Sequence, residues 1–505
     1  MTRRWLVLGV LSAALALVSL DNTIVNVALP RLQEDLGATT AQLQWVVDAY
    51  SVVFAGSLLL AGALGDRFGR RLLLIVGLVI FIIASLGAVF ADTALALTLC
   101  RALMGLGGAC IMPSTLSILV QVFPSPHERA QAIGIWAAVA GVGVAIGPII
   151  GGFLLEHFSW HAIFWVNPPL ALLMLLATVA FVPESSDPAK PRLDVRGALL
   201  CGAGLIALVI TIIEIPESGI DAFTITTAVL TVVFLVSFVW WERRAPRPLL
   251  PMGLFGVPLF RAAVVTVGLV YFALMGAMFF LPQFLQLVQG MTPLQSGLAV
   301  VPGAGGLLIA SLFSPRIADR IGTRFTVVLG LGVVTLGLAS FSTLTAAAPY
   351  ALVGITFFCV GLGLGLTLPQ ATNGVLASVP PERAGMGSAV NDAMSELGGA
   401  FGVAILGAAM SITYRQNIEQ AITDAGDAVN VLPPGALDAA RESLAAASIA
   451  AQQLPAEIAT IFRTVAGDAF VGGMNWALFV GAGIAALGAV FAWFSFPARV
   501  DRVAE

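Results

Sequence analysis

Charged side chains are scarce in this chain, making up only 10% of its 505 residues. The single lysine, Lys190, has no glycine-rich run beside it, which excludes a Walker A nucleotide site and an ATP-driven pump. The three histidines lack metal-ligand spacing. No serine or cysteine nucleophile has a histidine partner within an apolar segment. We therefore expect no metal, no cofactor and no enzyme activity.

What the chain has instead is apolar length. Its residues are 59% hydrophobic and the mean hydropathy is +0.98, more than a water-soluble fold could bury, so the solvent must be lipid. Runs of roughly 20 apolar residues, too long for barrel strands, predict an all-α integral membrane protein of about 14 spans. The predicted spans are 5–28, 42–64, 72–91, 94–119, 130–153, 160–182, 196–214, 222–241, 262–288, 295–314, 325–344, 350–373, 384–411 and 470–494.

Two charged loops occur twice at nearly one spacing. The segment 66–71 (Asp-Arg-Phe-Gly-Arg-Arg) is repeated 253 positions later as 319–324 (Asp-Arg-Ile-Gly-Thr-Arg). The segment 126–130 (Pro-His-Glu-Arg-Ala) is repeated 254 positions later as 380–384 (Pro-Pro-Glu-Arg-Ala). Such repeats are typical of secondary transporters built from two copies of a helical unit.

The repeat offset leaves the seventh and eighth spans without counterparts. We therefore predict a six-helix bundle at 1–182, a linker with two extra spans at 183–251, and a second six-helix bundle at 252–505. A hydrophilic stretch at 415–468 lies between the last two spans, and its pattern predicts a hairpin of two short amphipathic helices. Most of the 24 basic residues fall on one side of this topology, which predicts a plasma (inner) membrane protein with both termini cytoplasmic.

Three ionisable residues lie inside apolar runs of the first half. Asp21 is in the first span, Asp48 opens the second and Arg101 lies within the fourth. At 1.5 Å per residue all three reach a similar depth in the outer half of the membrane. Because a buried charge is expensive in lipid, we expect the carboxylates to face the arginine. Such a carboxylate could take up and release protons, or the group could be a static ion pair that only fixes helix packing.

A second acidic pair lies in the thirteenth span. Asp392 and Glu396 are four residues apart and so share one helix face, about 12 and 18 Å deep. Two carboxylates with no cation nearby in sequence repel each other and favour a positive ligand. The alternatives are a pair lining a wet cavity, or one neutralised by an arginine on another helix. Tyr271 and Trp136 could offer aromatic faces to an organic cation.

Candidate conformational residues lie in the repeated loops and in a glycine-rich segment, 143–152. Glycines at four-residue spacing around a proline favour either a hinge or a tight helix seam. In the 66–71 loop we expect the carboxylate to cap the helix that follows, and the arginines to meet lipid phosphates or neighbouring helix ends. The residues concerned are Asp66, Arg67, Gly69, Arg70, Arg71, Gly143, Gly147, Pro148, Gly151, Asp319 and Arg320.

These segments resemble motifs of the major facilitator superfamily. Residues 62–71 resemble its loop signature, 97–109 its fourth-helix motif, 143–152 its antiporter motif, and 20–30 the first-helix signature of fourteen-span drug:proton antiporters. Residues 389–398 are similar to the acidic segment of exporters of quaternary ammonium and other lipophilic cations. The resemblance implies a major-facilitator fold of two six-helix repeats plus an inserted helix pair.

The same resemblance implies that Asp21, Asp48 and Arg101 couple transport to protons, and that Asp392 and Glu396 bind the substrate cation. Those exporters often have another acidic residue in the tenth span, and 295–314 has none, so dicationic substrates are not implied. The expected partners are lipophilic cations, protons and the lipid bilayer, with no nucleic acid, and the expected state is monomeric. Two alternatives stay open: export of a neutral or anionic natural product, and a non-transporting membrane sensor.

Overall fold

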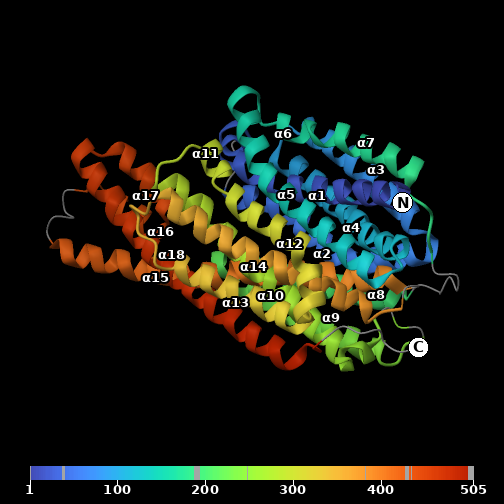
Figure 1. The fold of residues 1–505 in the computed structure, drawn as a ribbon. Helices are drawn as coiled ribbons and strands as arrows, with labels where there is room; N and C mark the ends of the chain where they lie inside the picture. Colours follow the sequence, from blue (N-terminus) through green and yellow to red (C-terminus); the bar gives the residue numbers. More distant parts are fainter. Residues whose placement is uncertain are drawn as a thin grey trace.

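The computed structural model describes residues 2–36, 40–186, 194–246, 248, 250–380, 383–426, 432–433 and 435–498. Throughout these residues the regular secondary structure is helical, without a strand. The helices lie side by side in an elongated bundle (Figure 1). Within the described ranges, fourteen helical segments are long and apolar enough to cross a membrane. The prediction of an all-α membrane protein is confirmed.

The first six spans begin at the N-terminus, and the sixth is formed by two consecutive helices. They are α1 (Thr2–Leu36), α2 (Thr40–Phe68), α3 (Arg70–Val89), α4 (Ala94–Val122), α5 (Pro126–His157) and α6 (Ala162–Trp165) with α7 (Asn167–Phe181). The next two spans are α8 (Val195–Ser218) and α9 (Ala222–Glu242). Asp194 and Asp221 start the inserted pair by accepting hydrogen bonds from amides of the first helical turn, as N-caps do.

The last six spans follow a short 3₁₀ turn, η1 (Met252–Gly256). They are α10 (Pro258–Gln283) with the π-helical η2 (Phe284–Val288), α11 (Pro293–Leu298) with α12 (Val301–Ile321), α13 (Thr323–Phe341), α14 (Tyr350–Ala377), α15 (Ala384–Ala425) and α18 (Ala456–Ser495). Proline is the first residue of α5, α10 and α11, where its missing amide hydrogen costs no helical hydrogen bond.

Helix packing repeats between the two halves. In the first half α1 packs on α5, while α4 packs on both α2 and α3, and α3 also meets α7. The second half has the equivalent pairs, in which α10 packs on α15, α14 packs on both α12 and α13, and α13 meets α18. The predicted fold of two six-helix repeats is confirmed, whereas the unit boundaries at 182/183 and 251/252 stay a prediction.

The halves meet along two related seams, α5 against α12 and α2 against α15. The inserted helix α8 packs on α2 and α15, and α9 packs mainly on α8. The outward side of α9 exposes Val229, Val232 and Val236 by 55%, 62% and 62%. Aliphatic side chains so exposed fit a surface in contact with lipid.

The two ends of the bundle differ. At one end, here termed the charged-loop face, α1 begins, α2 and α12 finish in their repeated loops, and α18 ends (Figure 1). At the other end, the hairpin face, α16 (Ala436–Glu442) and α17 (Leu444–Ala450) lie between the tips of α15 and α18 (Figure 1).

The predicted hairpin at 415–468 is only partly right. Both short helices exist, but α15 continues to Ala425 and α18 already begins at Ala456. At about 1.5 Å per residue, the 42 residues of α15 exceed the roughly 30 Å hydrocarbon layer twofold. No glycine or proline interrupts the chain from the predicted span end to Gly426, where φ is +54°, so nothing stops the helix earlier.

Hydrogen bonds tie this hairpin to the bundle. The Tyr414 hydroxyl donates to the carbonyl of Ala440 at 2.8 Å. The Arg441 guanidinium donates to Glu419 at 2.7 Å and to Asp438 at 3.2 Å, and these bonds raise the pKa of Arg441 above its usual value. The hairpin is thus fastened to α15.

Candidate functional site

The first polar site joins three spans of the first half. Arg101 of α4 donates to Asp21 of α1 at 2.6 Å, and the Asn167 amide of α7 donates to the other Asp21 oxygen at 2.6 Å. All three residues are fully buried. The structure therefore brings Asp21 and Arg101 together as the sequence predicts. Asp48 lies in α2, but its side chain is outside the described residues.

Arg101 has further contacts with α2. Its Nε donates to the Val46 carbonyl at 3.3 Å, and its guanidinium carbon lies 4.6 Å from the centre of the Tyr50 ring. Opposite charges at hydrogen-bond distance offset much of the cost of burial, while removal of one partner would leave the other uncompensated. Any change in the charge of Asp21 must therefore act on Arg101.

Sequence reasoning missed Asn167, and it named Tyr50 only as an aromatic face for an organic cation, not as a neighbour of Arg101. Asn167 starts α7 directly before two prolines, and a polar residue at the head of an apolar run was the signal that could have found it. Tyr50 lies five residues from Trp45 in the same span, and nothing in its spacing points to an arginine on another helix.

The second polar site is on α15. Asp392 is fully buried, and its Oδ1 accepts from the Asn391 amide at 3.1 Å. Its Oδ2 is buried without a hydrogen-bond partner among the described residues. The side chains found to act on this carboxylate are Asn391, Glu396 and Ser388, and no guanidinium is among them. Of the alternatives open from sequence, a clamp by a distant arginine thus gains no support from the described residues.

Two tyrosines on other helices lie in the neighbourhood of this acidic pair. Tyr271 of α10 is within electrostatic range of both Asp392 and Glu396, and it contacts Ser395 between them. Tyr50 of α2 is within electrostatic range of Glu396. The pair thus faces both halves of the molecule, because α2 belongs to the first half and α10 to the second.

Trp136 has a different environment. It is a buried residue of α5, and its indole nitrogen donates to the Thr115 hydroxyl of α4 at 3.3 Å. This bond fixes the ring within the first half. Its role in substrate binding stays a prediction.

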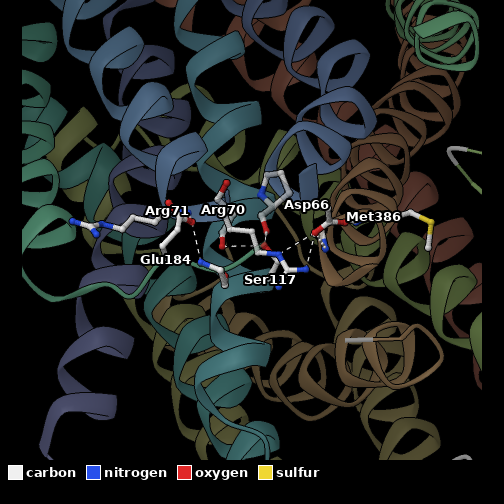
Figure 2. A network of polar contacts seen from close by, with 10 residues as sticks. Asp66, Arg70, Arg71, Ser117, Glu184 and Met386 are labelled. Atoms are coloured by element: carbon white, nitrogen blue, oxygen red, sulfur yellow. Dashed lines mark hydrogen bonds and ion pairs between the residues drawn. The ribbon is translucent and has the colours of Figure 1, made fainter. Parts of the chain in front are cut away.

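A third polar network lies at the charged-loop face (Figure 2). Asp66, at the end of α2, accepts from Arg70 Nε at 2.9 Å and from Arg70 Nη2 at 2.7 Å. It also accepts from the backbone amides of Gly385 at 3.0 Å and Met386 at 3.1 Å. Those amides belong to the first turn of α15, whose N–H groups have no helical partners and carry partial positive charge. One carboxylate thus joins the two halves.

The predicted role of Asp66 as a cap of the following helix is wrong. The helix that follows is α3. Its backbone amides at Arg71 and Leu72 donate instead to the Glu184 carboxylate, at 3.1 and 3.2 Å. Asp66 is still inside the last turn of α2, so its side chain points across to α15 rather than forward along the chain. Arg71 donates to the Val179 carbonyl at 2.5 Å, which ties the loop to α7.

Two positions in and before this loop, Gly62 and Gly69, require glycine. Gly69 has φ +123°, and a Cβ there would lie 2.7 Å from a Glu184 oxygen, so both backbone and space require glycine. A Cβ on Gly62 would lie 2.5 Å from the Gly385 carbonyl oxygen. The glycines therefore allow α2 to approach α15 and Glu184 to reach α3.

The repeated loop in the second half has different contacts. Asp319, at the end of α12, lies 3.1 Å from Nδ1 of His127 in α5, and both side chains are more than half exposed. Gly322 again has positive φ, +92°. Arg320 is exposed, and Arg67 in the first loop lies over the Phe68 ring at 5.2 Å. This loop also joins the two halves, but at the surface.

The glycine-rich segment of α5 forms a tight seam with α1. Cβ atoms on Gly143 and Gly147 would lie 2.8 Å from the Ala16 carbonyl and 2.9 Å from the Leu20 carbonyl. A Cβ on Gly151 would lie 2.9 Å from the Ile24 side chain. Of the two readings open from sequence, the geometry favours the close-packed seam.

Beyond this seam, Pro148 packs against α11 of the other half, where a Cβ on Gly297 would lie 3.2 Å from the Pro148 carbonyl carbon. The halves therefore touch toward the hairpin face as well as at the charged-loop face.

Comparison with known proteins gives a consistent family. Residues 11–403 match the model of the Major Facilitator Superfamily. The chain is 36% identical to the multidrug efflux pump LfrA of Mycolicibacterium smegmatis, over 94% of this chain and 92% of that one. It is 33% identical to the tetracenomycin C resistance and export protein of Streptomyces glaucescens, over 99% and 93%.

Among solved structures, the human organic anion transporter MFSD10 has a similar fold. The TM-score is 0.62 with 16% sequence identity, over 97% of this chain and 99% of that one. At this identity the likeness concerns the fold alone.

Proposed function

The chain belongs to the Major Facilitator Superfamily, and from this premise we propose that it is a proton-coupled antiporter that exports lipophilic, mainly cationic drugs or biocides by alternating access. Membership makes it a multi-pass membrane transporter and not an enzyme. Drug export is supported by LfrA, which is named a multidrug efflux pump and is similar over nearly the whole chain.

The main support for a cationic substrate is the acidic pair of α15. A fully buried Asp392 with one oxygen unbonded within the described structure is stable only with a proton or a positive ligand. Glu396 lies one turn away on the same face, and Tyr271 adds an aromatic ring with a hydroxyl. A lipophilic cation would meet negative charge and an aromatic surface in one place.

Proton coupling is assigned to Asp21, Arg101 and Asp48. Protonation of Asp21 removes the charge that Arg101 faces at 2.6 Å, so proton binding and the packing of α1 on α4 are linked. Protons then enter at Asp21 or Asp48, and the substrate cation competes with protons at Asp392 and Glu396.

Alternating access is assigned to the contacts between the halves. Asp66 and the first turn of α15 hold the charged-loop face closed, and release of this contact would open it. Arg67, Arg70, Arg71 and Arg320 gather at this face, which by the positive-inside rule is cytoplasmic. Both termini then lie in the cytoplasm and the hairpin outside. Since one chain holds both halves, we expect the monomer to transport.

Everted membrane vesicles test the site assignment. Addition of a monocationic dye such as ethidium should dissipate a preset pH gradient, and Asp392→Asn with Glu396→Gln should abolish that response because no negative charge remains on this face of α15. The matched control is Asp424→Asn, an exposed carboxylate on the same helix, which should respond as the wild type does. A normal response in the double variant would exclude this pair as the cation site.

A second candidate is export of one neutral or anionic natural product. The relative from Streptomyces glaucescens favours it, because that protein is named for a single compound, tetracenomycin C. A screen of cationic, neutral and anionic compounds in the same vesicles separates the two, since only the cation exporter would lose its responses in the Asp392→Asn, Glu396→Gln variant.

A further inference from the structure

Tyr50 occupies a position that two glycines of the neighbouring helix make possible. The residue is 1% exposed, and a Cβ on Gly108 of α4 would lie 2.5 Å from its hydroxyl oxygen. A Cβ on Gly105 would run into the Tyr50 backbone carbonyl. The ring also stacks on Phe54, with 5.8 Å between centroids and 13° between planes. Tyr50 is thus closely packed against α4 in this arrangement.

The ring of Tyr50 lies against a polar site, whereas its hydroxyl is buried beside Gly108 of α4. The ring lies 4.6 Å from the Arg101 guanidinium, which in turn binds Asp21. The hydroxyl is buried without a hydrogen-bond partner among the described residues. The charged groups in electrostatic range of this tyrosine are Asp21 on α1, Arg101 on α4 and Glu396 on α15. Tyr50 therefore contacts the Asp21–Arg101 pair and lies on the stretch of α2 where Val52 and Ala55 belong to the cluster that packs against Leu397, the neighbour of Glu396.

A buried hydroxyl without a partner is rare, because its desolvation is not compensated. A hydroxyl both donates and accepts, so it can serve a carboxylate whose charge changes. In the arrangement seen here, the ring–guanidinium contact and the packing against α4 hold that hydroxyl unbonded. A shift of Arg101 would free the ring to turn toward α15.

We propose that Tyr50 is a positioning residue that transmits the state of the Asp21–Arg101 pair to Glu396, its hydroxyl donating to the Glu396 carboxylate when Arg101 moves. The inference rests on the proposed function, because it supplies the link between the assigned proton site and the assigned cation site. A hydrogen bond from Tyr50 stabilises ionised Glu396 and thereby changes its attraction for a cation. The two sites would then be coupled through one side chain, which contacts Arg101 in this structure and would bind Glu396 after the shift.

A double-mutant cycle in proteoliposomes tests this link. The measured quantity is the Kd of ethidium between pH 5.5 and 8.5, for the wild type, Asp21→Asn, Tyr50→Phe and the double variant. We expect Asp21→Asn alone to change the Kd by about fivefold or more, the lower end of typical coupling between sites. In the Tyr50→Phe background the same substitution should change it by less than about twofold, because the connecting hydroxyl is gone.

One further variant and one flux measurement keep the outcomes separate. Tyr50→Phe retains the ring on Arg101, so its thermal stability should stay near that of the wild type, whereas Tyr50→Leu should lower it. Loss of the Asp21 effect in Tyr50→Phe supports the link. An Asp21 effect of undiminished size in that background overturns it, as does the absence of any Asp21 effect in the wild-type background. The proposed function fails separately, if ethidium moves no protons through the wild type.

Discussion

The two charged loops are close repeats in sequence but form different contacts. Asp66 is 5% exposed and accepts four hydrogen bonds, two of them from the first turn of α15. Asp319 occupies the equivalent place in the second half, but its contact with His127 is at the surface. Exposed pairs contribute about 0–1 kcal/mol, while breaking a buried one costs about 3–5 kcal/mol. Two loops that are repeats in sequence therefore form contacts of different strength between the halves.

The largest expected effect is that of Asp66→Asn. The variant removes the carboxylate charge that lies 2.7 Å from the buried Arg70 guanidinium, at a cost of about 3–5 kcal/mol to the contact between α2 and α15. Hydrogen exchange measured by mass spectrometry should show the first-turn amides of α15 exchanging about 100-fold faster or more. Asp319→Asn is the matched control and should leave those amides protected. Similar protection in both variants would show that the loops are equivalent after all.

An intermediate effect is expected for Gly385→Ala. The new Cβ would meet the Asp66 carboxylate and lie 2.7 Å from the Gly62 carbonyl, so α15 must move away from α2. Overpacking of this kind costs about 1–3 kcal/mol and should lower the melting temperature. Gly332→Ala on α13 is the control, because its Cβ would meet nothing within 4 Å. If both alanines gave the same melting temperature, the close approach of the halves at Asp66 would be refuted.

The smallest effect is expected for His127→Ala. An exposed pair 3.1 Å apart should contribute at most about 1 kcal/mol, and less at high salt, because mobile ions screen surface charges. Thermal unfolding at low and high salt measures it, with Asp319→Asn added in the His127→Ala background as the control. A loss well above 1 kcal/mol, or one that persists at high salt, would place the second loop on a level with the first.

Most of the fold could be predicted from the sequence, since lipid requires each crossing segment to be long and apolar. Fourteen predicted spans have counterparts in the structure, and the repeat offset identified the inserted pair α8 and α9. The hairpin was predicted too large because hydropathy marks where lipid contact ends, whereas α15 continues beyond that point without a glycine or proline until Gly426.

The polar sites could be predicted only where a charged residue interrupts an apolar segment. Depth counting brought Asp21 and Arg101 together, and the structure places them 2.6 Å apart. Tyr50 and Glu184 could not be found in this way, because their partners are set by packing between distant segments. The same limit explains the error at Asp66, whose helix partner is adjacent in space and not in sequence.

Because α15 is one continuous helix from the Asp66 contact to the hairpin, a displacement of its first turn is transmitted to its C-terminal end. Its first turn donates hydrogen bonds to Asp66 of the opposite half, and its middle contains the acidic pair. Near its C-terminal end, Tyr414 binds the carbonyl of Ala440 in α16. A fluorophore attached to α16, at the opposite end of the bundle, should therefore report each time the hydrogen bonds between Asp66 and α15 break.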